Sequence, residues 1–212
     1  MFASREDAGL NLGRCLQDQR VRADLVLGLP RGGVVVASGV AQALHQPLDV
    51  LVVRKIGHPR HREFAVGALA ENGVTALDED AIETNAVVRA ELEAVIETEQ
   101  ELLRSYQARF HPKGAPALVG KTVLLVDDGL ATGATMEAAV LSVRKQSALS
   151  ILVAAPVASS DAVERLARVA DEVRVLSMDP DFEAVGRYYD VFAQTTDEEV
   201  LELLRGRAGR DA

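Results

Sequence analysis

Short apolar runs alternate with longer amphipathic stretches through most of the chain. Five runs of Val, Leu, Ile and Ala have the length of strands buried on both faces: 24–29, 48–53, 122–127, 149–155 and 172–177. Helical spacing predicts helices at 34–45, 133–145 and 160–169. This alternation predicts an α/β fold with a doubly wound, mainly parallel five-stranded sheet. Ligands of such sheets bind beyond the carboxyl ends of the strands.

Two stretches interrupt this rhythm. Residues 54–78 are basic at first, then Gly-containing and partly strand-like, and we interpret them as a flexible flap. Residues 80–110 carry apolar side chains at a 3–4 spacing and predict one long helix. This helix either packs along the body of the protein or forms a subunit contact. At 212 residues, we expect residues 1–212 to form a single domain with such an insertion.

Composition excludes several classes of protein. An apolar fraction of 48% and a charged fraction of 26% are those of an ordinary globular chain. The 23 Lys and Arg against 32 Asp and Glu give a net charge of −9, and aromatics are only 4%, so we expect no nucleic-acid partner. No apolar run reaches the roughly 18 residues of a membrane span. The N-terminus lacks the pattern of a signal peptide, so we expect a cytoplasmic protein without a membrane partner.

The strongest chemical pattern is the stretch 123–135. A buried strand ends at two adjacent carboxylates, Asp127 and Asp128, and a loop of small residues with two threonines then opens a helix. Backbone N–H groups at a helix N-terminus bind phosphate. Carboxylates beside a phosphate require a ligand that also offers hydroxyls or a metal, as a sugar phosphate does. The stretch lacks the Gly-Lys-Ser/Thr ending of a nucleoside-triphosphate loop.

Residues 123–135 resemble the thirteen-residue signature of type I phosphoribosyltransferases, which bind 5-phosphoribosyl-1-pyrophosphate (PRPP). The resemblance implies that Asp127 and Asp128 face the ribose hydroxyls and take part in catalysis. It also implies that the loop wraps the 5-phosphate through Gly129, Ala131, Thr132, Gly133, Ala134 and Thr135. We expect Mg²⁺ as cofactor, held mainly by PRPP oxygens near the two aspartates and by no dedicated set of side-chain ligands.

A second loop supports this resemblance. Residues 28–33, Gly-Leu-Pro-Arg-Gly-Gly, follow the first predicted strand and open a helix. Glycines allow close approach of the backbone, and Arg31 supplies a planar fork of donors for phosphate oxygens. The family has its pyrophosphate loop at this point. The resemblance therefore assigns pyrophosphate binding to Pro30, Arg31, Gly32 and Gly33, and a catalytic role to Arg31.

The predicted flap begins with a basic run, in which six of residues 54–63 are Arg, Lys or His. This run is either a solvated basic surface or the family's loop that closes over the leaving group. The second interpretation implies that Arg54 and Lys55 bind pyrophosphate, with Lys55 and Glu63 as further catalytic candidates. Arg-Lys followed by Glu-Phe-Ala-x-Gly-Ala, here residues 63–68, also resembles a less characterised subgroup of the family. That subgroup usually has small polar residues where this chain has residues 60–62, Arg-His-Arg.

The resemblance also implies a hood over the acceptor, at about residues 178–212. Residues 178–192 hold four of the eight aromatic side chains in the chain. Phe182 is the candidate for stacking on an acceptor base, although aromatics there could equally pack a cap onto the sheet. The family habit and the long helix suggest a homodimer.

The implied reaction transfers 5-phosphoribosyl from PRPP to a nitrogen acceptor, expected to be a nucleobase, with release of pyrophosphate. The chain is then a glycosyltransferase of the phosphoribosyltransferase type. Ala131 stands where the hypoxanthine–guanine branch has an Asp, which argues against a close relative of that branch. The alternative is a regulatory or sensor protein that binds PRPP without turnover.

Overall fold

The computed structural model describes residues 1–112 and 114–208. Its main sheet has five parallel strands in the order β2-β1-β6-β7-β8. In that order they are Leu48–Val50, Leu25–Gly28, Thr122–Val126, Ser150–Ser159 and Glu172–Asp179. The predicted α/β class and the five-stranded parallel sheet are confirmed.

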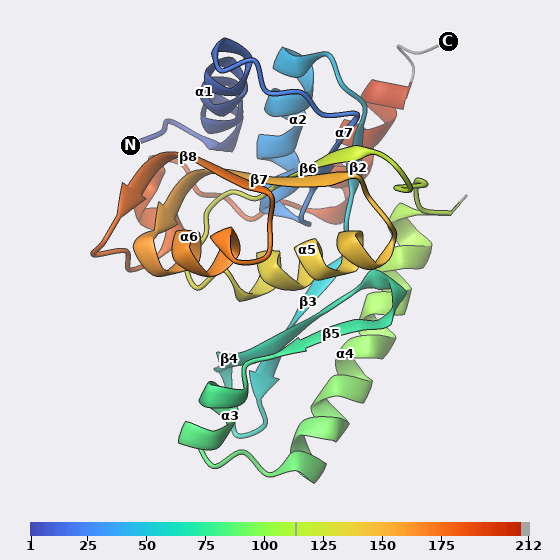
Figure 1. Cartoon of the computed structure of the whole chain (residues 1–212), viewed down its shortest axis with the longest axis vertical. Helices are drawn as coiled ribbons and strands as arrows, with labels where there is room; N and C mark the ends of the chain where they lie inside the picture. Colours follow the sequence, from blue (N-terminus) through green and yellow to red (C-terminus); the bar gives the residue numbers. More distant parts are fainter. Residues whose placement is uncertain (113, 209–212) are drawn as a thin grey trace.

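Helices cover both faces of the main sheet (Figure 1). One face carries α1 (Arg5–Asp18), α2 (Gly32–Leu44) and α7 (Asp197–Ala208), and the other carries α5 (Ala134–Lys145) and α6 (Ser160–Ala167). Alternate strand residues divide between two buried clusters. Leu124 belongs to the cluster on the α1–α2 side, and Leu125 to the one on the α5–α6 side. Strands buried on both faces explain the nearly continuous apolar runs.

Helix α1 was absent from the elements expected from the sequence. It begins after Ser4, whose hydroxyl accepts a hydrogen bond from Asp7 N, and it crosses α2 at very short range. A Cβ at Gly39 of α2 would lie 2.6 Å from the carbonyl carbon of Gly9 in α1. Only glycines at this crossing let the two backbones approach so closely.

The predicted flap folds as a second, antiparallel sheet with the order β3-β4-β5. These strands are Val53–His58, His61–Ala70 and Val74–Leu77, with the short 3-10 helix η1 (Glu71–Gly73) between the last two. Val53 and Ala68 pack with the α5 side, whereas Ile56 and Val66 pack with Leu92 of α4. Both faces of this sheet are therefore covered, and α4 runs along it in Figure 1.

Two expected elements differ from the structure. The single helix expected at 80–110 is wrong, because Ala86 takes a left-handed conformation (φ 49°) and separates α3 (Glu79–Thr84) from α4 (Arg89–Phe110). The strand expected at 48–53 ends at Val50, where Leu51 N donates to Gly28 O and the chain turns into β3. The hood region contains η2 (Val185–Tyr188) and α7, and its residues 209–212 lie outside the described residues. Among the described helices none is long and apolar enough to cross a membrane.

Candidate functional site

The two glycine-containing loops meet at the carboxyl ends of β1 and β6. These strands are neighbours, with Gly28 opposite Val126, and Leu29 N donates to Val126 O at 3.0 Å. A Cβ at Gly33 would lie 2.6 Å from Asp127 Oδ1, and a Cβ at Gly32 would collide with the Asp128 carboxylate. The structure therefore brings the predicted pyrophosphate loop and the predicted ribose-binding acids together, and only glycine fits between them.

The carboxyl groups of Asp127 and Asp128 lie next to each other and are both shielded from water. Asp127 Oδ1 accepts a hydrogen bond from Asp128 N at 2.9 Å. Burial raises the pKa of Asp127 well above its usual value, and the neighbouring charge of Asp128 raises it further. Burial also raises the pKa of Asp128, although the Arg5 guanidinium opposes this shift. Each of the two carboxyls therefore holds a proton more readily than a free aspartate does.

Arg5 is a member of this cluster that sequence reasoning missed. Its Nε lies 2.7 Å from Asp128 Oδ2, its Nη1 donates to Ala193 O at 2.6 Å, and its guanidinium lies 3.8 Å from the centre of the Phe192 ring. Only 11% of the Arg5 side chain is exposed. No local signal marks this residue, because its role depends on where α1 crosses the sheet.

The predicted 5-phosphate loop is fastened to the neighbouring strand β7. Leu130 N donates to Val157 O at 2.9 Å, and the Ser159 hydroxyl donates to Ala131 O at 2.5 Å. Gly133 has φ 74° and is the N-cap residue of α5, and Ala131 and Thr132 are exposed. The first N–H groups of a helix have no partner within it. The exposed loop and the start of α5 thus form a cradle suited to an anion.

Arg31 lies on the other loop, and its peptide bond with Pro30 is cis. Its Nη1 is 3.8 Å from Asp197 Oδ1 at the start of α7. Asp197 also receives Arg109 Nη1 at 2.5 Å from the end of α4. Arg31 is thus a partly exposed cation that is loosely paired and placed on the predicted pyrophosphate loop.

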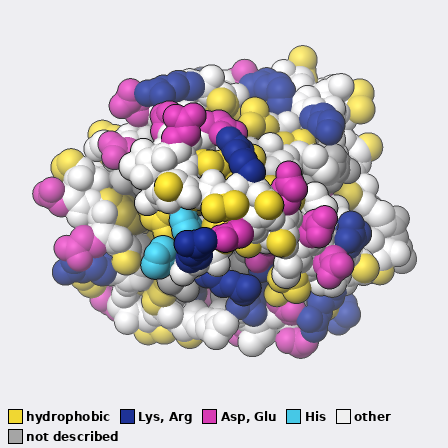
Figure 2. Space-filling model, turned by 90° about the horizontal axis from the view of Figure 1, so that it is seen from below, with side chains coloured by type: hydrophobic (Ala, Val, Ile, Leu, Met, Phe, Trp, Pro, Cys, Tyr) yellow, Lys and Arg dark blue, Asp and Glu magenta, His cyan; other side chains and the backbone are white. Residues whose placement is uncertain are grey.

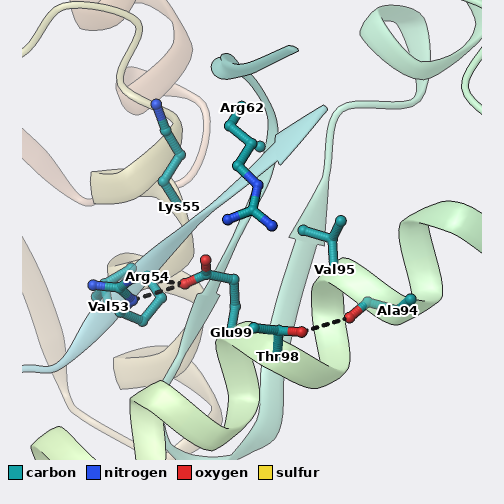
Figure 3. A pocket seen from close by; sticks show the side chains of 9 residues that line it. Val53, Arg54, Lys55, Arg62, Ala94, Val95, Thr98 and Glu99 are labelled. Atoms are coloured by element: carbon teal, nitrogen blue, oxygen red, sulfur yellow. Dashed lines mark hydrogen bonds and ion pairs between the residues drawn. The ribbon is translucent and has the colours of Figure 1, made fainter. Parts of the chain in front are cut away.

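Arg54 and Lys55 lie on β3 and line a cavity of about 430 Å³ between the second sheet and α4. Arg54 Nη2 is 2.8 Å from Glu99 Oε2. Figure 3 shows the Arg62 guanidinium directed toward Glu99 and the Lys55 amine directed away from it. Arg54 of β3 is therefore already paired with Glu99 of α4. The pyrophosphate role of Arg54 and Lys55 stays a prediction. The Glu63 side chain lies outside the described residues.

The turn between β3 and β4 carries the rest of the basic run. The His58 and His61 rings are 5.3 Å apart, and Arg60 Nη2 lies 2.7 Å from Glu91 Oε1 of α4. Figure 2 shows histidine side chains beside a Lys or Arg side chain on the face seen from below, with acidic side chains close by. The run therefore forms a mixed, partly paired surface.

The aromatic part of the predicted hood lies over the acid loop. Phe182 stacks on Tyr188 with ring centres 5.0 Å apart, and its stacking on an acceptor stays a prediction. The Tyr189 hydroxyl donates to Asp128 O at 2.5 Å. A Cβ at Gly129 would lie 2.7 Å from Val185 Cγ1. The hood segment thus closes one side of the cluster.

Comparison with known proteins agrees with this geometry. A family model described as phosphoribosyl transferase domain matches residues 10–192. Two curated proteins from Mycobacterium tuberculosis strains, whose names assign them provisionally to the phosphoribosyl transferases, are 42% identical over all 212 residues. The match covers 48% of each, so the chain spans about half the length of these relatives.

Solved structures show the same fold. The crystal structure of TT1426 from Thermus thermophilus is 44% identical, has a TM-score of 0.82, and is matched over 99% of this chain and 100% of that one. A Neisseria gonorrhoeae protein with bound ppGpp has a TM-score of 0.52 at 14% identity, with 99% of this chain and 97% of that chain covered. At that identity the second likeness concerns the fold alone.

Proposed function

The chain belongs to the type I phosphoribosyltransferase family, and from this premise we propose that it transfers the 5-phosphoribosyl group of PRPP to a nitrogen acceptor. One observation carries the proposal: the glycine loop 30–33 and the acid pair Asp127 and Asp128 meet at one edge of the sheet, next to the cradle at the start of α5. A ligand with a phosphate at one end, a diol in the middle and a pyrophosphate at the other matches these three features.

The proposed reaction is a displacement at C1 of the ribose. The nitrogen lone pair forms the new C1–N bond, the C1–O bond breaks, and pyrophosphate leaves with its bonding electrons. The nitrogen then loses a proton to a base. The transition state carries positive charge on the ribose ring, as in glycoside hydrolysis. Asp127 and Asp128 would hold the ribose hydroxyls and place negative charge beside that ring.

The leaving group would meet the other loop. The backbone at Gly32 and Gly33 allows close approach to pyrophosphate oxygens, and Arg31 would add a charge-assisted hydrogen bond. The loose 3.8 Å pairing with Asp197 leaves the Arg31 guanidinium available for this contact. We propose that Lys55 assists from β3 once PRPP is bound.

Magnesium fits the donors at this place. Asp127 and Asp128 offer carboxylate oxygens, the ligand type that Mg²⁺ prefers, and such sites commonly take one or two carboxylates plus substrate phosphates. Among the described residues no group of three or more His, Cys, Asp or Glu could hold a metal. We propose that PRPP oxygens hold Mg²⁺ near the two aspartates. When bound, the ion would offset negative charge on the departing pyrophosphate.

We propose a nucleobase as the acceptor, received between the acid loop and the hood segment that contains Phe182. The loop has Ala131 in the position that carries an Asp in the hypoxanthine–guanine branch. A base proton would therefore be handled by a group outside this loop, and we propose no close hypoxanthine–guanine activity.

The test is calorimetric titration of the chain with PRPP, with and without Mg²⁺, followed by assays of pyrophosphate release with a panel of nucleobases. We expect magnesium-dependent binding that weakens when Asp127→Asn and Asp128→Asn are combined, with the fold retained. Undetectable binding to the wild-type chain would overturn the proposal. Binding without turnover on any base would instead favour the regulatory or sensor alternative.

A further inference from the structure

Arg165 on α6 connects three segments that are distant in sequence. Its Nε lies 2.8 Å from Glu137 Oε2 in the first turn of α5. Its Nη2 lies 2.9 Å from Asp78 Oδ2 at the start of α3, and its Nη1 donates to Thr132 O at 3.4 Å. The side chain is 29% exposed, so these partners engage a half-buried guanidinium.

Glu137 explains why a cation is needed at this point. It is the acidic residue of the first turn of α5, and its N–H donates to Gly133 O at 2.8 Å, within the 5-phosphate cradle. A negative side chain near a helix N-terminus competes with a bound anion for the same positive end of the helix. Arg165 neutralises this carboxylate and leaves the N-terminus of α5 free for the phosphate.

Asp78 ties the second sheet to the same guanidinium. It caps α3 by accepting from Ala81 N at 2.9 Å, and its own N–H donates to Val66 O at 3.0 Å. The hydrogen bond from Ala81 lowers the pKa of Asp78, although burial opposes that shift. Asp78 therefore stays charged and fixed. Asp78 joins the end of β5 to α6 through Arg165. Helix α6 also supports the 5-phosphate loop, because its N-cap residue Ser159 donates a hydrogen bond to Ala131 O.

We propose that Arg165 is a positioning residue for the 5-phosphate cradle and that it couples the second sheet to that cradle. It acts through Glu137 and the Thr132 carbonyl and does not touch PRPP. The inference rests on the proposed function. It adds that the contact between Arg165 and Asp78 couples phosphate binding at the cradle to the antiparallel sheet. Because coupling is reciprocal, a change at Asp78 alters phosphate affinity, and phosphate binding stabilises α3.

Titration with ribose 5-phosphate and with pyrophosphate tests the proposal, because the two ligands probe opposite ends of the site. We expect Arg165→Ala to raise the Kd for ribose 5-phosphate roughly three- to tenfold, the size of a charge effect at a helix N-terminus, and to leave the Kd for pyrophosphate unchanged. Adding Glu137→Gln to Arg165→Ala restores part of the affinity, because the unpaired carboxylate is removed. Asp78→Asn weakens ribose 5-phosphate in the same direction.

Arg144→Ala is the matched control. Arg144 also joins distant segments, through Asp171 Oδ2 at 3.1 Å and Val169 O at 2.9 Å, but none of these partners lies on the cradle. We expect its Kd for ribose 5-phosphate to equal that of the wild type. Hydrogen exchange of residues 79–84 should slow when ribose 5-phosphate binds the wild type and stay unchanged in Arg165→Ala.

The outcomes separate the two proposals. Equal weakening of both ligands in Arg165→Ala, no recovery on adding Glu137→Gln, or an equal effect in Arg144→Ala would overturn the positioning role. Unchanged exchange of residues 79–84 in the wild type would overturn the coupling. A wild-type chain that binds neither PRPP nor ribose 5-phosphate would overturn the proposed function as well, before any variant is measured.

Discussion

Arg5 offers the sharpest test of how a cation offsets the burial of the acid pair. Arg5→Met preserves an unbranched stem but removes the guanidinium that pairs with Asp128 at 2.7 Å. The two side chains are 11% and 15% exposed, so the pair is largely shielded from water. Removing one partner of a buried pair costs about 3–5 kcal/mol when the other must stay charged. Protonation of the remaining carboxyl relieves part of this cost.

The sign of the pH dependence follows from the direction of the Asp128 shift. Burial already raises the pKa of this carboxyl, and Arg5 is the group that lowers it. In Arg5→Met the folded pKa rises further, so the folded chain binds more protons than the unfolded chain above about pH 4. Near pH 4 the variant therefore loses only about 1 kcal/mol of the free energy of unfolding. This loss comes from the missing hydrogen bond to Ala193 O and the missing contact with Phe192. It grows to about 3 kcal/mol near pH 8.

Urea denaturation of the wild type and Arg5→Met at both pH values measures this difference. Arg14→Met is the control, since Arg14 lies exposed on the same helix. We expect its effect to be within about 0.5 kcal/mol at either pH. Adding Asp128→Asn to Arg5→Met should remove most of the pH dependence. A loss in Arg5→Met that is the same at both pH values would refute the reasoning.

Three other predictions concern the loops and the core. Arg31→Ala should weaken pyrophosphate and PRPP by roughly tenfold or more in calorimetric titration and spare ribose 5-phosphate; equal losses for all three ligands would argue against the leaving-group role. Burial opposes charge on His111, but the hydrogen bond with Asp49 and the Glu71 carboxylate 3.5 Å away outweigh this and raise its pKa to about 9. Protonated His111 then contributes about 3 kcal/mol to the free energy of unfolding below pH 6.5, and this contribution is lost as pH rises through about 9. His111→Gln should therefore destabilise the protein at pH 6 and match the wild type above pH 10. A loss that does not depend on pH would contradict this. Gly39→Ala should destabilise by about 1–3 kcal/mol in thermal and urea unfolding, because its Cβ meets the α1 backbone at 2.6 Å. Gly206→Ala, with nothing within 4 Å of its Cβ, is the control and should be neutral or slightly stabilising.

Much of the fold could be predicted because its signals are local. Each parallel strand is a short apolar run, and the loops at 28–33 and 127–135 are contiguous stretches in which glycines and acids follow a strand end. A parallel sheet places the carboxyl ends of its strands at one edge. That rule was sufficient to expect the two loops at one site, although it could not show that they touch through Gly33 and Asp127.

Other features followed no local signal. The apolar positions at 80–110 follow a helical spacing that is broken by Glu99, and only the left-handed Ala86 shows where the chain turns from α3 to α4. The basic run at 54–63 was interpreted as a surface or a flap, and the structure places it on β3, on the turn that follows and on the start of β4, where Glu99 of α4 pairs with Arg54. Neither outcome is encoded within a window of ten residues, because each depends on what packs against the segment.

The amino-acid sequence by itself determined the alternation of strands and helices, the position of both loops and the membership of a family, because these depend on hydrophobic periodicity and on residues that are consecutive. Only the tertiary structure showed that Arg5 and Arg165 lie beside the two loops. Arg5 meets Asp128 across 123 positions and Arg165 meets Asp78 across 87. A charged side chain finds its partner through the packing of the elements that carry it, and that packing is a property of the whole core rather than of any segment.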